Sequence, residues 1–571
     1  MIRPASLSIE SQRRRGMLRI MTPPPSARPR HELILFAIGL ACVLGFFLFR
    51  AWMFWPLTVD DAYITMRHAR NLVNGHGFVY NIGGPRVESY TNHSLFLIQV
   101  ALIALKMNVV VWTKLIGVGS GLAVIAGALV LARLLLRESG LADRSLIWML
   151  PGAWVLADSP LLATGSVAGL ETALFAALTT WSVVLVFRIV GSGAVSANAA
   201  PIVAGIVLGL ATWTRPEGIA WALGLVVVAA IVVRKDRVKL RAMGVIAIIV
   251  VTFWASLTVY RISIFGYPFP NSYYVKMGGS PLSRAHSGLQ YFRDWAILNR
   301  GAALLLLTLV GVVCAPRSGR ILCAVALAAV CGHLALTIYE GGDWMPHLRM
   351  ITPCMGVLCA LVSVAFAVTV NRLAPAREKT AAIALMIAFC PLWTMWLHRE
   401  LMRALNEVQV RVYGWADGHE AMAKWFAAWE ESREAKGGPP LLVAIEDIGL
   451  VGFYSDLRII DLAGLADPEW AHYSYDTGLI YDYPAERLVI DKRPDAVVLV
   501  TQTPPTAPVT RMDWHTNQAV FKHPLFHRLY RYSATWTHKA FENDGYFLNV
   551  YVRNDVFGEP PQPHPPLGRA R

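Results

Sequence analysis

Two adjacent carboxylates and three cations are the residues of this chain best suited to chemistry. Asp60 and Asp61 follow the first long apolar stretch. A carboxylate can act as a general base toward a hydroxyl group or as a nucleophile at carbon. Lys276, Arg215 and Arg349 lie near the ends of later apolar stretches, and cations stabilise the charge that develops on a departing phosphate. These residue types indicate group transfer from a lipid-borne phosphate, with the aspartates at the reacting carbon and the cations at the phosphate.

Other polar and aromatic residues near these positions are candidates for binding a sugar or an acceptor. Aromatic side chains suit a sugar face, although an interfacial aromatic belt is the simpler interpretation for them. The full set of candidates is Arg67, Asn71, Glu88, Glu171, Asn271, Tyr274, Asp343 and Trp344.

Each of these residues also has a structural interpretation. Asp61 is well placed to cap a helix starting near Ala62, which leaves Asp60 slightly favoured as the catalytic carboxylate. Glu171 can pair with Arg215 as a purely structural ion pair. Basic side chains at span ends can extend to lipid headgroups, and an aspartate after two glycines can form a turn; these alternatives apply to Lys276, Arg349 and Asp343.

Nothing in the sequence indicates a metal ion or another cofactor. His76, His93 and His347 show no paired ligand spacing. The seven cysteines include no CxxC pair and lie in or beside apolar stretches, which is typical of buried packing. We therefore predict no metal site and no cofactor.

The elements that must position these residues are membrane spans. The chain has 571 residues, of which 55% are hydrophobic and 16% charged, values typical of a polytopic α-helical membrane protein. Its net charge of +14 falls largely in short loops, as the positive-inside rule requires, and does not indicate nucleic acid. About 20 apolar residues cross a bilayer. Eleven spans are expected, at 33–55, 111–134, 145–160, 170–190, 200–214, 217–233, 240–264, 299–315, 320–338, 350–370 and 380–398.

The distribution of lysine and arginine predicts the orientation. With eleven spans, the basic loops share the cytoplasmic side with the N-terminus, provided that the short apolar segment 94–107 lies along the membrane surface. The segment 56–110 is then one outer loop. Five polar clusters fall on the outer side, at 60–61, 169–172, 214–218, 270–276 and 341–349. Ionisable groups at membrane depth usually line a cavity or pathway, so we expect an active site at the outer boundary.

The chain divides into four parts. We expect a disordered cytoplasmic tail at 1–30 and a transmembrane domain at 31–400. Apolar runs then shorten to strand length, at 441–445, 457–462, 496–500 and 546–552, which predicts a soluble, extracytoplasmic α/β domain at 401–558. Residues 559–571 form a Pro-rich tail.

The outer-loop pattern DD…R..RNLVNGHGFVYN.G..RVE..T resembles the first outer loop of bacterial GT-C membrane glycosyltransferases. It is most similar to the arabinofuranosyltransferases that add arabinofuranose to mycobacterial cell-wall arabinan. The same family carries motifs that resemble the GLE at 169–171, the TRPEG at 214–218, the G…PN…K at 266–276 and the GGD…R…P at 341–353. The segment 446–465 resembles the outer soluble domain of the family. The chain departs from the pattern at Gly83–Arg86 and at Val275.

This resemblance implies a GT-C fold, a polyprenyl-phosphate sugar as donor, and a site without a metal ion. It implies that Asp60 or Asp61 is the catalytic carboxylate and that Lys276 and Arg349 lie near the donor phosphate. The expected acceptor is an envelope glycan or glycoprotein, and the expected location is the bacterial inner membrane. Two rival functions are a transporter or flippase for lipid-linked sugars and a non-catalytic glycan-binding envelope protein. Both inverting and retaining mechanisms remain open.

Overall fold

The computed structural model describes residues 30–141, 146–191, 199–278, 280–343, 348–373, 377–477, 484, 486–501, 515–537 and 546–563. Trp344, His347, the first 29 residues and the last eight lie outside the described residues.

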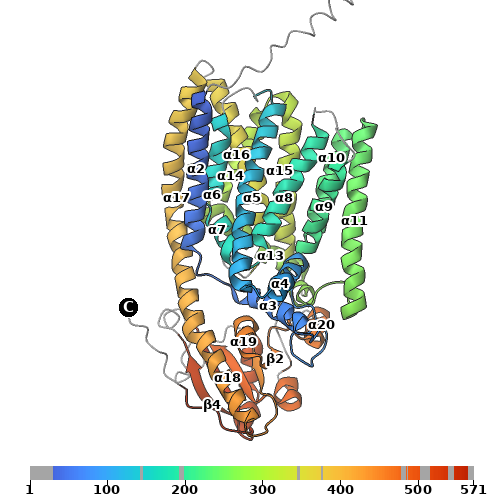
Figure 1. The fold of residues 1–571 in the computed structure, drawn as a ribbon, viewed down its shortest axis with the longest axis vertical. Helices are drawn as coiled ribbons and strands as arrows, with labels where there is room; N and C mark the ends of the chain where they lie inside the picture. The colour runs from blue at the N-terminus through green and yellow to red at the C-terminus, as the bar shows by residue number, and fades with distance from the viewer. Residues whose placement is uncertain are drawn as a thin grey trace, which may run out of the picture.

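A bundle of long apolar helices forms the larger part of the molecule (Figure 1). Among the described residues, seven helices are long and apolar enough to cross a membrane, or up to nine if each of two bent helix pairs is one span. The seven are α2 (Arg30–Met53), α5 (Val109–Glu138), α8 (Thr172–Val190), α11 (Arg237–Phe265), α15 (Arg317–Glu340), α16 (Thr352–Leu373) and α17 (Glu378–Gly414).

Two bent pairs and three short apolar helices complete the bundle. One pair is α6 (Leu150–Asp158), preceded by the 3₁₀ turn η1 (Leu146–Met149), and α7 (Pro160–Val167), with a 58° bend between them. The other pair is α13 (Pro281–Leu298) and α14 (Gly301–Cys314), bent by 79°. The short helices are α4 (His93–Ala104), α9 (Ala199–Thr214) and α10 (Gly218–Val233). Every expected span overlaps one of these helices or pairs, while α7 and α13 were not expected.

Helix α16 lies at the centre of the bundle. Its apolar window is 89% buried, whereas the corresponding window of α2 is 17% buried. Glycines allow close packing around it: a Cβ added to Gly152 of α6 would lie 1.8 Å from the carbonyl oxygen of Cys359. A helix buried on all sides must be apolar all round, and α16 therefore shows no polar stripe.

Short elements separate the bundle from the soluble domain. Helix α3 (Asp60–Val73) and α4 follow α2, and the segment between them forms a small hairpin closed by the Val79–Arg86 bridge. Helix α12 (Asn271–Met277) follows α11. In Figure 1 these elements lie at the end of the bundle that faces the soluble domain.

The soluble domain contains a five-stranded mixed sheet in the order β2-β1-β3-β5-β4. Strand β1 (Leu442–Ile445) pairs in parallel with β2 (Arg458–Asp461) and β3 (Ala496–Thr501). Strand β5 (Phe547–Arg553) pairs antiparallel with β3 and with β4 (Tyr530–Trp536). The predicted strand runs correspond to β1, β2, β3 and β5. Strand β4 was missed because its sequence, YRYSATW, is largely polar and alternates in burial at the sheet edge.

Helices cover the sheet and connect it to the bundle. Helix α17 runs out of the bundle into the π-helical turn η4 (Trp415–Glu420) and then α18 (Ala421–Glu434), as Figure 1 shows. The remaining helices are α19 (Ile448–Ser455), α20 (Pro468–Thr477), the π-helical turn η5 (Arg487–Lys492), α21 (His515–Lys522) and α22 (Phe526–Leu529). Strand β3 is buried along its whole length, as expected for a central strand covered on both faces.

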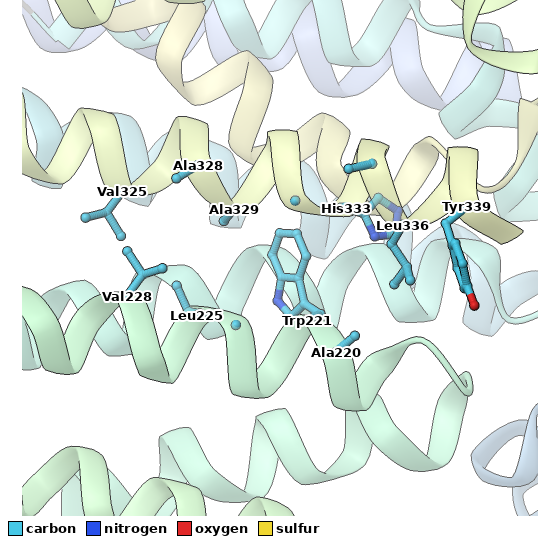
Figure 2. A pocket seen from close by; sticks show the side chains of 13 residues that line it. Ala220, Trp221, Leu225, Val228, Val325, Ala328, Ala329, His333, Leu336 and Tyr339 are labelled. Carbon is cyan, nitrogen blue, oxygen red and sulfur yellow. The ribbon is translucent and has the colours of Figure 1, made fainter. Parts of the chain in front are cut away.

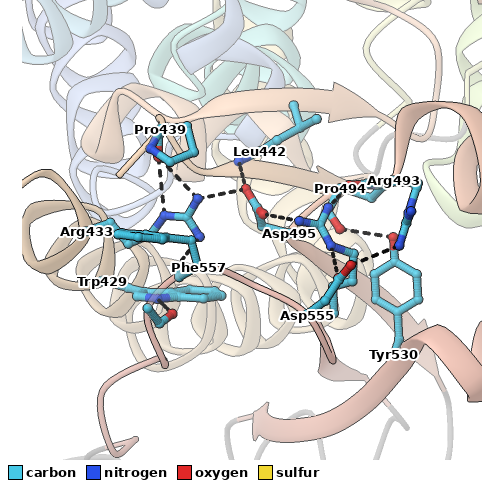
Figure 3. A network of polar contacts seen from close by, with 12 residues as sticks. Trp429, Arg433, Pro439, Leu442, Arg493, Pro494, Asp495, Tyr530, Asp555 and Phe557 are labelled. Atoms are coloured by element: carbon cyan, nitrogen blue, oxygen red, sulfur yellow. Dashed lines mark hydrogen bonds and ion pairs between the residues drawn. The ribbon is translucent and has the colours of Figure 1, made fainter. Parts of the chain in front are cut away.

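A buried ionic network fixes α18 to the sheet (Figure 3). The carboxylate of Asp495 accepts hydrogen bonds from Leu442 N (3.0 Å), Arg433 Nη2 (3.3 Å) and Arg553 Nη2 (3.1 Å). Arg433 also donates to the carbonyl oxygen of Phe557 (2.7 Å). Nearby, Trp425 donates to the carbonyl oxygen of Pro561 (2.9 Å), so the first residues of the Pro-rich tail pack on α18. The sheet, α18 and this segment therefore form one unit.

Candidate active site

Both aspartates lie in the first turn of α3. The helix begins at Asp60, its N-cap residue is Val59, and no side chain caps it. The expectation that Asp61 caps a helix starting at Ala62 is therefore wrong, because the helix starts two residues earlier. Acidic residues in a first turn are stabilised by the helix dipole without forming a cap.

The structure brings four of the predicted site residues into one pocket. Asp61, Glu171, Lys276 and Arg349 line it together. They come from α3, the turn before α8, α12 and the segment before α16, and these elements are far apart in the sequence. The pocket volume is about 50 Å³, so a sugar ring requires the lining side chains to move apart.

The pocket also contains residues that were not predicted. Leu465 belongs to the soluble domain, so both parts of the molecule contribute to the wall. Thr65, Ser89, Asn92 and Ser272 line the pocket as well. Their hydroxyl and amide side chains lie in or beside the motif segments, and this position could have identified them from the sequence. No sequence signal identifies Leu465, because only the docking of the two parts places it there.

Opposite charges surround Asp61. Burial raises the pKa of the Asp61 carboxyl above its ordinary value, and the charges of Lys276 and Arg349 act in the opposite direction. Arg349 forms an ion pair with Asp343. Burial opposes ionisation of Asp343 as well, but Arg349 and Lys276 reverse the effect and hold its pKa below the ordinary value. Within the described residues, Lys276 forms no ion pair of its own, so its ammonium group is available to an anion in the pocket.

Arg215 lies outside the pocket and pairs with Glu171, one of the residues that line it. Its guanidinium group donates to Glu171 Oε1 at 2.5 Å and to Glu217. Glu171 Oε2 accepts a hydrogen bond from Asn92 Nδ2 at 2.9 Å. Arg215 is buried and does not line the pocket. The predicted Glu171–Arg215 ion pair is therefore present, and a contact of Arg215 with a donor phosphate stays a prediction.

Several predicted sugar- or acceptor-binding residues lie outside the pocket and fix the chain instead. Arg67 donates to the carbonyl oxygens of Tyr80 (2.9 Å) and Leu457 (2.6 Å), which joins α3 to the soluble domain. Asn71 donates to the carbonyl oxygens of Val79 and Tyr80 in the hairpin. Buried polar groups require partners, and for Arg67 Nε and Nη2 and for the Asn71 amide these partners are backbone carbonyls.

Glu88 and Asn271 are also used for structure. The carboxylate of Glu88 accepts from Arg261 Nε at 2.7 Å and Nη2 at 3.1 Å. Asn271 Nδ2 donates to the carbonyl oxygens of Gly464 (3.1 Å) and Leu465 (2.9 Å). Asn271 thereby fixes the backbone that presents Leu465 to the pocket.

Tyr274 belongs to an aromatic group beside the pocket. Its ring centroid lies 4.2 Å from that of His472 and 5.5 Å from that of Tyr475, both in α20. The group joins α12 to the soluble domain. Tyr274 does not line the pocket, and its sugar contact stays a prediction.

An apolar groove runs along the bundle between α10 and α15 (Figure 2). Its volume is about 480 Å³. Trp221, Leu225 and Val228 line one side, and Val325 and Leu336 the other.

The groove ends beside the polar site. Its last residues, Ala220 and Tyr339, lie near the beginning of α10 and the end of α15. Helix α10 begins directly after the Arg215–Glu217 turn, and α15 ends directly before Asp343. An apolar chain in this groove would thus point its head toward the cations of the pocket.

Among the described residues, no group of three or more histidine, cysteine or acidic side chains could hold a metal ion. The pocket offers two carboxylates, Asp61 and Glu171, two cations, several hydroxyl groups and one amide. Glu171 is paired with Arg215, which leaves Asp61 as the carboxylate suited to proton transfer or attack.

Comparison with known proteins identifies the fold. Residues 403–551 match a family model described as a domain of unknown function (DUF8728). No curated protein sequence matches the chain. The solved structure of ArnT from Cupriavidus metallidurans bound to undecaprenyl phosphate is 14% identical with a TM-score of 0.52, and the match covers 92% of this chain and 99% of that one. Its apo form is 15% identical, with a TM-score of 0.52 and coverages of 91% and 97%.

An oligosaccharyltransferase from Archaeoglobus fulgidus, in a complex with Zn and sulfate, is similar as well. It is 12% identical with a TM-score of 0.50, and the match covers 87% of this chain and 80% of that one. At such identities the likeness shows the fold. The chain is a polytopic α-helical membrane protein with the GT-C fold and a C-terminal soluble α/β domain.

Proposed function

We propose that this protein is a membrane glycosyltransferase that transfers a sugar from a polyprenyl-phosphate donor to an envelope glycan or glycoprotein. The observation that carries the proposal is the position of Asp61, which shares a pocket with Lys276 and Arg349. The apolar groove begins near the Arg215–Glu217 turn, and Arg215 pairs with Glu171 of that pocket. The similarity in fold to ArnT, whose structure holds undecaprenyl phosphate, supports a lipid-linked donor. The reaction takes place on the outer face of the bacterial inner membrane, where the polar ends of the spans were predicted to lie.

The donor would occupy the groove and the pocket together. Its polyprenyl chain packs between α10 and α15, where apolar side chains line about 480 Å³. Its phosphate reaches Lys276 and Arg349, and the sugar lies toward Asp61. Arg349 is already paired with Asp343, so its guanidinium is oriented before the donor binds.

The transfer step uses Asp61 as a general base. The ionised carboxylate removes the proton from an acceptor hydroxyl, and the oxygen attacks the anomeric carbon of the donor sugar. The bond between that carbon and the phosphate oxygen breaks, and polyprenyl phosphate leaves with the bonding electrons. Lys276 and Arg349 stabilise the charge on the leaving phosphate. A retaining enzyme would use the same carboxylate as the nucleophile, and analysis of the product anomer distinguishes the two mechanisms.

Among sugars, we propose arabinofuranose as the donor sugar. The support is the resemblance of five ordered sequence motifs to the arabinofuranosyltransferases. The departure at 83–86 lies in the predicted outer loop. Val275 lies in α12, whose Ser272 and Lys276 line the pocket, so the sugar must be tested directly.

The deciding experiment incubates the purified protein with a panel of polyprenyl-phosphate sugars and detects hydrolysis or transfer. We expect release of polyprenyl phosphate from one donor, with polyprenyl-phosphate arabinofuranose as the best substrate. Asp61→Asn should lower the rate by about 10³-fold or more, because it removes the base but keeps the shape.

Asp294→Asn is the matched control, because Asp294 lies on the surface of α13, outside this pocket, with 46% of its side chain exposed. It should keep the wild-type rate. Full activity of Asp61→Asn would reject Asp61 as the catalytic residue. Movement of labelled lipid across proteoliposomes without any chemical change would instead identify a flippase.

A further inference from the structure

Asp60, the neighbour of the proposed base Asp61, is bound to the soluble domain. Asp60 Oδ2 accepts a hydrogen bond from Gly449 N at 2.8 Å, and Asp60 Oδ1 accepts one from Leu450 N at 2.7 Å. Both donors lie in the first turn of α19, where backbone N–H groups have no partner within the helix. A side chain of the membrane part thus caps a helix of the soluble domain.

The two helices approach so closely that only glycine fits between them. A Cβ on Gly449 would lie 2.0 Å from the carbonyl oxygen of Asp60. A Cβ on Gly452, one turn later, would lie 2.2 Å from the hydroxyl oxygen of Tyr80. The Gly449 contact is made backbone to backbone, so it fixes the first turn of α3 more tightly than flexible side chains would.

A second group of polar residues supports the contact. Asp447, just before α19, accepts hydrogen bonds from His419 Nε2 at 2.8 Å and from the hydroxyl of Tyr546. His419 is buried in the turn that follows α17. The residue that precedes α19 is therefore held by two other parts of the soluble domain, η4 and the residue before β5.

Two further contacts fix the remainder of α3. Arg67 donates to the carbonyl oxygen of Leu457 at 2.6 Å, and Arg70 donates to that of Phe453 at 2.7 Å. Successive residues of a helix point in different directions, so Asp61 faces the pocket while Asp60 faces α19.

We propose that Asp60 is a positioning residue: the hydrogen bonds from α19 hold the first turn of α3 and thereby place the Asp61 carboxylate at the reacting carbon. This inference rests on the proposed function. It assigns the soluble domain a role in the chemical step, beyond any role in binding an acceptor. A misplacement of about 1 Å can lower a rate about 10²-fold, which is the scale expected here.

The charge of Asp60 gives the inference a distinctive signature. Burial and the neighbouring Asp447 raise the pKa of Asp60 to about 7, while His419 and the N–H of Leu450 act in the opposite direction. The other titratable groups whose charges interact with it are Asp61, Tyr63 and Tyr80 of the membrane part and Tyr546 of the soluble domain. Both oxygens accept N–H groups, and a protonated carboxyl is a poorer acceptor. As the pH falls through about 7, Asp60 takes up a proton, and the N–H bond to its protonated oxygen should weaken although burial favours the neutral carboxyl.

The test compares four full-length variants in the sugar-transfer assay: Asp60→Asn, Asp60→Ala, Gly449→Ala and the control Asp456→Asn. Asp456 pairs with Arg70 across the same interface but is 68% exposed. We expect kcat to fall about 10-fold in Asp60→Asn, which keeps one acceptor oxygen, and about 100-fold in Asp60→Ala and Gly449→Ala. The KM for the donor should change less than about twofold in each, because the phosphate contacts remain.

The pH profile separates positioning from mere folding. In the wild type, the acid limb of a plot of log kcat against pH should have a slope of about 2, because both Asp61 and Asp60 take up a proton. In Asp60→Asn the slope should be about 1. If Asp60 only supports folding, the variants lose folded protein while kcat per folded molecule and the slope stay unchanged, and that result overturns the inference.

The outcomes also distinguish this inference from the proposed function. If Asp61→Asn is inactive and Asp60→Asn has the wild-type kcat and profile, the positioning role is rejected and the glycosyltransferase proposal stands. If Asp61→Asn is fully active and Asp60→Asn is inactive, the catalytic assignment itself is rejected. If Asp60→Ala fails to fold, Asp60→Asn and Gly449→Ala carry the test.

Discussion

At the scale of single residues, the pair Asp60–Asp61 shows how neighbours acquire different roles. The two side chains differ in direction because consecutive helical positions are rotated by about 100°. One carboxylate meets two backbone N–H groups, and the other meets two cations in a pocket. The same residue type thus serves as a support in one position and as a proposed base in the next.

Removing Lys276 should change the pH dependence of the reaction. The charge of Lys276 lowers the pKa of Asp61 against the effect of burial. In Lys276→Gln this pKa should rise, so the acid limb of the kcat profile should move to higher pH. We also expect kcat at neutral pH to fall by about 10–100-fold, since the leaving phosphate loses a cation. An acid limb that stays in place, measured beside the exposed control Lys424→Gln, would contradict the effect of the Lys276 charge on Asp61.

The sequence indicated Asp61, Glu171, Lys276 and Arg349 because polar residues at span ends are expensive and rare. It indicated Arg67, Asn71, Glu88 and Asn271 for the same reason, and the structure places these four outside the pocket with partners within the protein. A buried polar side chain needs a partner, but the residue type does not say whether the partner is a substrate or a backbone carbonyl. That distinction depends on the packing of distant segments.

At the scale of elements, glycines determine how closely neighbouring helices can pack. A Cβ on Gly117 of α5 would lie 2.0 Å from the carbonyl oxygen of Ser166 in α7, whereas a Cβ on Gly119 would meet nothing within 4 Å. Gly117→Ala should therefore separate α5 from α7 and lower the thermal unfolding midpoint in detergent. Gly119→Ala, in the same helix, should leave the midpoint unchanged or raise it, because alanine favours the helix by about 1 kcal/mol. Equal midpoints for the two variants would contradict this packing.

The ionic group around Arg215 holds the beginnings of α8 and α10 together. Arg215→Met leaves the buried carboxylates of Glu171 and Glu217 without their cation. Loss of one partner of a buried ion pair typically costs about 3–5 kcal/mol, and we expect a comparable loss in unfolding free energy. The control is Arg293→Met, which removes an arginine that is 65% exposed and should cost about 0–1 kcal/mol. Denaturant titration of both variants measures the difference.

The bends in the bundle could not be predicted from the hydropathy of the sequence. The break between α6 and α7 falls at Ser159–Pro160, where proline has no N–H to continue the helix. The break between α13 and α14 falls at Arg300, which adopts φ 59°. Hydropathy registers apolar length rather than direction, so α7 and α13 were not identified as separate helices. Helices α9 and α10 have 16 residues each and span only about 24 Å, which explains why eleven expected spans become seven to nine by length.

At the scale of the whole molecule, the proposed binding of the donor lipid in the groove can be tested by filling the groove. Gly332 lines the groove and has free space around it. Gly332→Phe should fill part of the groove and raise the KM for a long-chain polyprenyl-phosphate sugar about 10-fold or more, with little effect on a short-chain donor. Gly244→Phe, on the exposed side of α11, is the control with equal bulk. If both variants behave alike with both donors, the groove does not hold the lipid.

The overall architecture could be predicted from composition and periodicity. An apolar run of about 20 residues is long enough to cross a bilayer, whereas a run of about five is typical of a buried strand. The fold was confirmed as GT-C by its likeness to solved structures. The docking of the two parts was not predictable. It depends on glycines at 449 and 452, whose role appears only when α19 lies against α3.

The contact between α3 and α19 also has a consequence for synthesis. Asp60 and its two partners are separated by 389 and 390 positions. At about 5–20 residues per second, the first turn of α3 waits roughly 20–80 s for α19 to be translated. Toward the end of that time the nascent chain carries Asp61, Glu171, Lys276 and Arg349 without the contact from α19. A prematurely terminated chain would therefore sit in the membrane and bind lipid but consume no activated sugar.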